Sequence, residues 1–174
     1  VAGLMGNGGA ANFSLKLGEK KKDEAKKSVG QVITLTTIVA ILLSVLSYIF
    51  LPTLINLFGC TTNVYPYALD YGKIIVIGAP FMIFYSSLSN TIRADGSPKY
   101  SMMMLCVGAI INIILDPIFI FGFNLGVKGG ALATIIGQIV SCIMAVRYLF
   151  KLKTVRLDKN SFKLDKNVFK ILSL

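Results

Sequence analysis

Long stretches without a charged residue dominate this sequence of 174 residues. No Asp, Glu, Lys or Arg occurs in residues 28–69, 74–92, 100–115 or 129–146. Roughly 20 helical residues are needed to cross a hydrocarbon core about 30 Å thick, and these stretches have that size. With 55% hydrophobic residues and a mean hydropathy of +0.72, the composition is also unlike that of a soluble domain. The sequence therefore predicts an integral membrane protein.

The apolar stretches predict four complete membrane spans. We expect them at about residues 31–58, 68–92, 100–123 and 127–149. The apolar runs are continuous instead of alternating, which favours helices over the strands of a membrane barrel. The few residues between the third and fourth spans leave room only for the turn of a helical hairpin. The predicted fold is an all-α, polytopic bundle of membrane helices.

The 18 basic residues are unevenly distributed around these spans. All but Lys73 and Lys128 lie before the first span, between the second and third, or after the fourth. An even number of spans separates these blocks, so they share one side, which the positive-inside rule identifies as the cytoplasm. Basic and aromatic residues do not interleave as on a nucleic-acid-binding surface, so the net charge of +10 reports topology. We expect a multi-pass protein of the inner (plasma) membrane with lysine-rich cytoplasmic loops and no nucleic-acid partner.

Several motifs fail as signs of enzyme chemistry. Residues 6–11, GNGGAA, fit a GxGxxA pattern, but no strand precedes them and a lysine-rich loop follows, so helix packing explains them better. The cysteines at positions 60, 106 and 142 are far apart, and the sequence has no histidine. A zinc cluster or a catalytic triad therefore has no basis here, and we expect neither a cofactor nor an enzyme.

Small residues recur along the fourth span at helical spacing. They form two rows, residues 126, 130 and 134 and residues 133, 137, 141 and 145. Small side chains at this spacing let helix backbones approach closely, which stabilises helix pairs in lipid by van der Waals contact. We expect this helix to be packed inside the bundle.

Asp116 lies within the third apolar span and calls for an explanation. A charge at the middle of a membrane helix costs about 2.5 to 3.5 kcal/mol, so it should face protein or water and should serve a purpose. Asn112 lies four residues earlier on the same face, and Pro117 leaves the carbonyl of Ile113 without its helical donor. These oxygens could bind a metal cation, or Asp116 could be protonated. The alternative is that Asp116 bonds a neighbouring helix and Pro117 only bends its own.

Three segments near this aspartate resemble a known family. RADGSPKYSM, GAIINIILDPIFIFG and GVKGGALATIIGQ are similar to the fourth, fifth and sixth helices of the multidrug and toxic compound extrusion (MATE) transporters. The resemblance implies about half of a twelve-helix, two-lobe transporter, which exports small organic cations in exchange for sodium or protons. Residues 1–150 would be part of the amino-terminal lobe, from the end of helix 2 through helix 6. Residues 151–174 would be the cytoplasmic linker between lobes and the start of helix 7, with the second lobe outside the chain.

The resemblance also assigns roles to individual residues. Asn112, Asp116 and Thr134 match the positions that bind the coupling cation, which would be sodium in a sodium-coupled member. A further carboxylate, on the first helix of the family, falls outside this chain. Tyr71 and Asn90 match positions near the central cavity, although an interfacial aromatic residue and a polar helix end explain them equally well. Pro117 is the expected helix bend and a plausible moving part.

A lipid-linked oligosaccharide flippase of the same superfamily is the alternative function. Such a protein should carry cationic residues in its cavity for an anionic headgroup, whereas the basic residues here lie at the ends of the spans. The sequence therefore favours the antiporter, with the lipid bilayer and small organic cations as its partners. It does not decide between sodium and protons.

Overall fold

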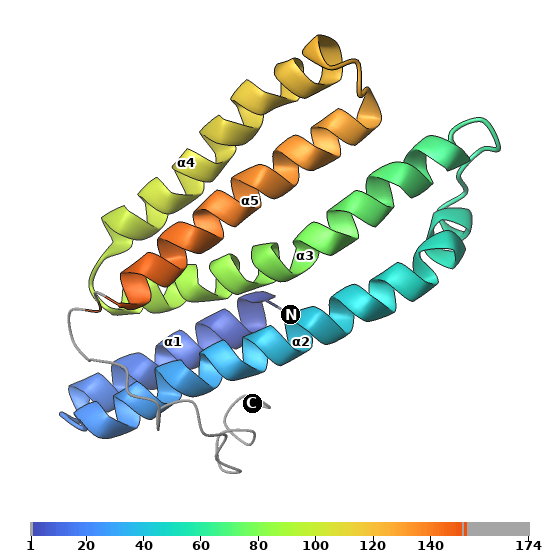
Figure 1. The fold of residues 1–174 in the computed structure, drawn as a ribbon. Helices are drawn as coiled ribbons and strands as arrows, with labels where there is room; N and C mark the ends of the chain where they lie inside the picture. Colours follow the sequence, from blue (N-terminus) through green and yellow to red (C-terminus); the bar gives the residue numbers. More distant parts are fainter. Residues whose placement is uncertain (1, 151, 153–174) are drawn as a thin grey trace.

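The structure, a computed structural model, describes residues 2–150 and residue 152, and this part of the chain is helical without a strand (Figure 1). The helices are α1 (Ala2–Gly18), α2 (Lys22–Leu57), α3 (Tyr65–Ala94), α4 (Pro98–Pro117), η1 (Ile118–Gly122) and α5 (Val127–Leu149). The all-α prediction is confirmed. The predicted inter-lobe linker, residues 151–174, lies outside the described residues except for residue 152.

Within the part of the chain that the structure describes, four helical segments are long and apolar enough to cross a membrane, as the sequence predicts. They are α2, α3, α4 together with η1, and α5. The largest difference is at the start of α2, which begins at Lys22 and not near residue 31. Asp23 and Glu24 lie in its first turn, where negative side chains interact favourably with the helix dipole. The helix therefore extends out of the apolar layer into the charged segment before it.

The helices form two antiparallel hairpins, α2 with α3 and α4 with α5 (Figure 1). Helix α3 packs against α1, α2 and α5, whereas α4 packs mainly against α5. The α1–α2 turn, the α3–α4 turn and the end of α5 lie at one end of the molecule, and the other two loops lie at the opposite end (Figure 1). This alternation is what a membrane protein with short loops requires.

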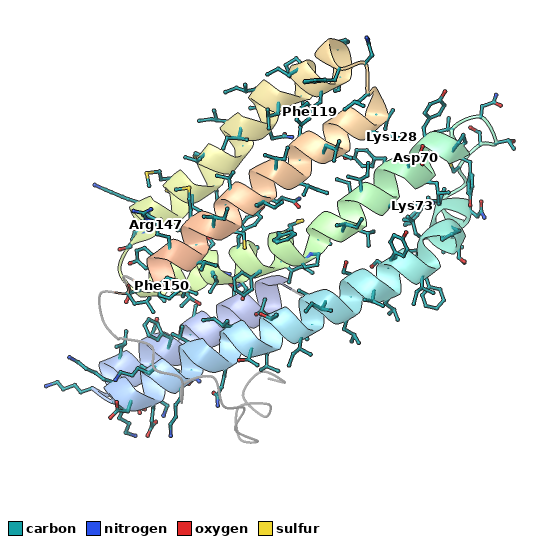
Figure 2. All side chains as sticks on the ribbon, in the orientation of Figure 1. Asp70, Lys73, Phe119, Lys128, Arg147 and Phe150 are labelled. Carbon is teal, nitrogen blue, oxygen red and sulfur yellow. The ribbon has the colours of Figure 1, made fainter. Side chains whose placement is uncertain are left out.

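The two ends of the molecule carry different sets of charged side chains. Arg147 lies at one end of α5, whereas Lys73, Lys128 and Asp70 lie at the other end of the hairpins (Figure 2). Lys128 and Asp70 form an ion pair of 3.0 Å between α5 and α3. In the α1–α2 turn, Lys21 donates a hydrogen bond that holds the pKa of Glu19 below its usual value. We call the end with Arg147 and the α1–α2 turn the basic end, and the opposite end the outer end.

Hydrogen bonds fix the α3–α4 turn to α5 at the basic end. Asp95 is 2% exposed, and the hydroxyl of Tyr148 donates to its Oδ2 at 2.8 Å. The hydroxyl of Tyr100 donates to the carbonyl of Met144 at 3.0 Å, and the rings of Tyr100 and Tyr148 are 4.8 Å apart. Gly96 has φ +79°, a left-handed conformation that suits glycine and turns the chain into α4. The turn is therefore a fixed part of the bundle.

Large apolar side chains cover much of the outer surface of the helices. On α2, for example, Ile41, Leu42 and Ile49 are 54%, 62% and 63% exposed. A soluble monomer rarely exposes apolar patches of this extent, because water makes them unfavourable. Lipid or other membrane helices must cover this surface, which agrees with the predicted membrane location.

The arrangement of the two ends predicts how single cysteines will react. We would place one cysteine at a time at Lys21, Lys99 or Asn124, in a chain whose three native cysteines have been replaced. All three positions are exposed. The first two should be shielded from an impermeant thiol reagent in intact cells, because they lie at the basic end, which we expect in the cytoplasm. Asn124, in the outer loop, should react, and labelling of Lys21 or Lys99 would contradict the topology.

A second prediction concerns the bond between Tyr148 and Asp95. Tyr148→Phe should lower the stability by about 1–3 kcal/mol, because a buried carboxyl group loses one of its donors. The measurement is thermal unfolding in detergent. Tyr67→Phe is the matched control, since Tyr67 is 61% exposed and should tolerate the same change. Equal melting temperatures for the two variants would show that the bond adds no stability.

Candidate cation-binding site

The α4–α5 hairpin brings together three residues that the sequence predicted as a cation site. Asn112 and Asp116 lie one turn apart on α4, and Thr134 faces them from α5. The Nδ2 group of Asn112 donates to Oδ1 of Asp116 at 3.4 Å and to Oγ1 of Thr134 at 3.3 Å. All three side chains are partly buried. One amide group thus holds a carboxylate and a hydroxyl side by side.

The hydroxyl of Thr134 is oriented by its own helix. It donates to the carbonyl of Gly130 at 2.9 Å, one turn earlier. A hydroxyl has one proton and two lone pairs, so the oxygen keeps its lone pairs for Asn112 and for one further group. Because the proton points back along α5, Thr134 presents an acceptor oxygen next to Asp116. This is the arrangement that a cation ligand needs.

Glycines allow α4 and α5 to approach to backbone contact around the site. A Cβ atom added at Gly137 would lie 2.5 Å from the carbonyl oxygen of Gly108 on α4. One added at Gly129 would lie 2.7 Å from the carbonyl carbon of Phe119. At Gly130 it would lie 3.8 Å from Oδ1 of Asp116. The predicted packing of the fourth span is confirmed, and its fully buried row begins at Gly129 and continues through residues 133, 137, 141 and 145.

Helix α4 changes its winding directly after Asp116. The α-helix ends at Pro117, and residues 118–122 form a π-helical turn in which the N–H of Phe123 donates to the carbonyl of Ile118 at 3.0 Å. Proline cannot donate a backbone hydrogen bond, and wide helical turns of this kind occur often at functional sites. The winding thus changes next to Pro117, and the predicted bend of the helix at this residue stays a prediction. A role of the Ile113 carbonyl as a cation ligand stays a prediction.

A cavity of about 180 Å³ lies beside Asn112 and Thr134, where α4 and α5 meet α3, and Asp116 does not line it. Asn112, Thr134, Gln138 and Tyr85 line it, among others. This volume holds several water molecules, since one needs only about 10–15 Å³ on this measure. A larger hollow of about 430 Å³ lies at the basic end near Tyr100 and Tyr148, away from Asp116. We take the smaller cavity as part of the site, because it contacts the coupled polar side chains.

Sequence reasoning did not identify every residue of this cavity. Gln138 lies four residues after Thr134 on α5, so helical periodicity could have placed both on one face. Tyr85 comes from α3, and its approach depends on how the hairpins cross, which no local pattern reveals. Ser141 was recognised only as a packing residue, and its hydroxyl donates to the carbonyl of Met104 at 3.1 Å.

The two residues of α3 that match central-cavity positions lie apart from the cation cluster. Tyr71 is 38% exposed near the outer end, and Asn90 lies against α1, where a Cβ added at Gly6 would be 2.6 Å from its Nδ2. Neither lines the 180 Å³ cavity. Their place at a central cavity between two lobes stays a prediction.

The chemistry of the site suits a hard monovalent cation. It offers one carboxylate and the neutral oxygens of an amide and a hydroxyl. Within the described residues, no group of three or more His, Cys, Asp or Glu side chains could hold a metal ion, and the three cysteines are free. A carboxylate with neutral oxygens can contact sodium, or the carboxylate can take up a proton.

Comparison with known proteins identifies related transporters. The family model described as MatE matches residues 1–118. The chain is 31% identical to the probable multidrug resistance protein YoeA of Bacillus subtilis, over 97% of this chain and 38% of that protein. It is 30% identical to a protein named FAD transporter in Shewanella oneidensis, over 93% of this chain and 36% of that protein. The chain thus spans less than two fifths of the length of these relatives.

The fold also matches solved structures. One is the inward-facing conformation of a multidrug resistance MATE family transporter of the MOP superfamily. The match has a TM-score of 0.92 at 22% identity and covers 98% of this chain and 39% of that one. At this identity the likeness shows the fold alone.

The contacts of Thr134 predict the effect of removing its hydroxyl. Thr134→Val keeps the shape, so the full-length protein should fold, but sodium affinity should fall about 10- to 100-fold if sodium binds here, as expected for a lost bond to a charged group. Calorimetric titration of the purified protein measures this affinity, and Thr134→Ser should largely restore it.

Thr37→Val provides a matched control for this substitution. Thr37 is exposed on α2 and makes the same kind of bond to its own helix, to the carbonyl of Ile33 at 2.7 Å. Its replacement should leave cation binding unchanged. If Thr134→Val also binds cations like the parent, Thr134 is a packing residue and not a ligand.

Proposed function

This chain belongs to the MATE family, and from this premise we propose that it forms part of an antiporter that exports organic cations in exchange for sodium ions or protons. Its relatives and structural neighbours are transporters, and the protein is a multi-pass membrane protein and not an enzyme. The observation that supports exchange is the cluster of Asp116, Asn112 and Thr134 within the α4–α5 hairpin. The coupling ion would be transported and not retained as a cofactor.

The proposed place of the chain in the transporter rests on the resemblance of its segments to the family's helices and on the share of its relatives that it covers. We assign residues 1–150 to the amino-terminal lobe, from the end of helix 2 through helix 6, and residues 151–174 to the linker and the start of helix 7. A second lobe and the first helix would complete the protein. The inner (plasma) membrane is the proposed location, with the basic end in the cytoplasm, because the lysines of the α1–α2 turn, Arg93, Lys99 and Arg147 lie at this end.

Asp116 would couple the two transported species through linkage. A cation that binds better in the outward-facing state than in the inward-facing state shifts the equilibrium by no more than that difference in affinity. Asn112 donates hydrogen bonds to both Asp116 and Thr134. Neutralising the carboxylate of Asp116 would weaken the bond that it accepts from Asn112. Pro117 and the π-helical turn follow directly, and they are the proposed moving part. Cargo release would then follow cation entry.

The distribution of charge supports a cationic cargo. Among the described residues, Asp116 is the carboxylate within the apolar part of a span. Basic side chains such as Lys128 and Arg147 lie toward the helix ends (Figure 2). An anionic cargo would be repelled by this carboxylate and would lack a partner at depth. FAD, which the Shewanella relative is named for carrying, and a lipid-linked oligosaccharide are both anionic. They are the alternative cargoes that an assay must include.

Replacement of Asp116 tests the proposed exchange. Asp116→Asn keeps the volume and the hydrogen-bonding capacity but removes the titratable charge. In the full-length protein we expect normal membrane levels, retained drug binding and loss of gradient-driven efflux, because the cation no longer distinguishes the two conformations. Asp116→Glu should retain part of the activity. Efflux by the Asn variant equal to that of the parent, at equal abundance, would contradict the proposal.

Proteoliposomes allow the coupling ion and the cargo to be varied separately. An imposed sodium gradient and an imposed pH gradient would each be tested with a fluorescent organic cation and with FAD. Transport of the organic cation by one gradient supports the proposal. Transport of FAD alone would replace the organic cation with an anionic cargo.

A further inference from the structure

Gln138 has a feature that the proposed exchange site does not explain. Its Oε1 atom is buried and has no hydrogen-bond partner within the described residues. A buried carbonyl oxygen without a donor is costly, so such groups usually contact water, an ion or a ligand. Gln138 lies one turn from Thr134 on α5 and lines the same cavity as Asn112 and Thr134. Its oxygen therefore belongs to the surroundings of the cation site.

Helix α3 leaves room for this amide. Gly78 faces Gln138, and a Cβ atom added there would lie 2.9 Å from Oε1. The same Cβ would lie 2.6 Å from Cγ1 of Ile135, so the space is limited. The amide end of Gln138 thus lies between α3 and α5.

Gln138 lies nearer the basic end of α5 than Thr134 does. The helix runs from Lys128 at the outer end to Arg147 at the basic end (Figure 2). One turn places Gln138 about 6 Å nearer the basic end than Thr134. At this level the α4–α5 seam is closed by contact between Gly137 and Gly108 and by the bond from Ser141 to Met104. The cavity beside this seam continues from Thr134 past Gln138 to Ser141, so a cation leaving Thr134 toward the basic end would pass Gln138.

We propose that Gln138 is a second, inner station for the coupling cation on its way from Asp116 to the cytoplasm. This inference rests on the proposed exchange function. Its carbonyl oxygen would contact a monovalent cation that carries part of its water shell, either sodium or hydronium. A neutral oxygen binds such an ion less tightly than a carboxylate does, and transit sites must bind weakly enough to release. The station would speed release without setting the affinity of the main site.

Gln138→Met in the full-length protein tests this role in proteoliposomes. The variant has a similar length but lacks the carbonyl oxygen, so the maximal transport rate should fall about tenfold, the effect of losing one modest polar contact. The cation concentration that gives half-maximal transport should stay within about twofold of the parent value, because Asp116, Asn112 and Thr134 are intact. Runs with a sodium gradient and with a pH gradient identify which cation uses the station.

Two further measurements separate this role from a structural one. Gln138→Met should melt no lower than the parent, since an apolar side chain replaces an unpartnered polar one. Gln31→Met removes another buried amide, on α2, and should leave the cation kinetics unchanged. An unchanged maximal rate in Gln138→Met, a higher half-maximal concentration at an unchanged rate, or a lower melting temperature would each overturn the proposal.

The Asp116→Asn variant is measured in the same experiment. If Asp116→Asn retains efflux, the proposed exchange function has failed and Gln138 has no cation to pass. If Asp116→Asn loses efflux while Gln138→Met transports like the parent, only the inner station is wrong.

Discussion

Backbone contact between α4 and α5 is the constraint on which the candidate site depends. Gly137 lies against the carbonyl of Gly108, and Gly129 against that of Phe119, so larger side chains at these positions would separate the helices. Separation would also break the bond from Asn112 to Thr134, which spans the hairpin. In lipid no hydrophobic force drives helices together, so close packing and hydrogen bonds between the helices must hold them together. The small residues of α5 therefore serve the chemistry of Asp116 through geometry.

The free-energy cost of placing the charge of Asp116 in an apolar helix connects this packing to the proposed function. Asp116 lies in an apolar helix, where an unpaired carboxylate is unfavourable by about 2.5 to 3.5 kcal/mol, and the described structure gives it a neutral amide partner and no basic one. Binding a cation or a proton would therefore lower the free-energy cost of the carboxylate here more than at an exposed position. The π-helical turn begins two residues later, where the helix ladder is already weakened by Pro117. The carboxylate and the π-helical turn are thus adjacent along the chain.

The sequence predicted those features that depend on composition and local spacing. The absence of charge identified the spans, and the spacing of four placed Asn112 and Asp116 on one face. Thr134 could be joined to them only through the family resemblance, because it comes from another helix. The bond from Tyr148 to Asp95 and the approach of Tyr85 and Gln138 were not predicted, since they depend on how the hairpins cross. The start of α2 at Lys22 was not predicted, because an apolar run indicates which residues lie in the bilayer and not where the helix begins.

The two ends of the bundle are held together by different kinds of contact. At the basic end, buried hydroxyls join neighbouring helices, as in the 2.6 Å bond between Ser89 and Ser101, and Asp95 accepts from Tyr148. At the outer end, α3 and α5 are joined by the ion pair of Lys128 and Asp70, whose side chains are 54% and 41% exposed. Exposed pairs contribute little, whereas buried hydrogen bonds are costly to break. A change at Asp116 should therefore move the outer part of the α4–α5 hairpin, while the basic end stays fixed and acts as the pivot.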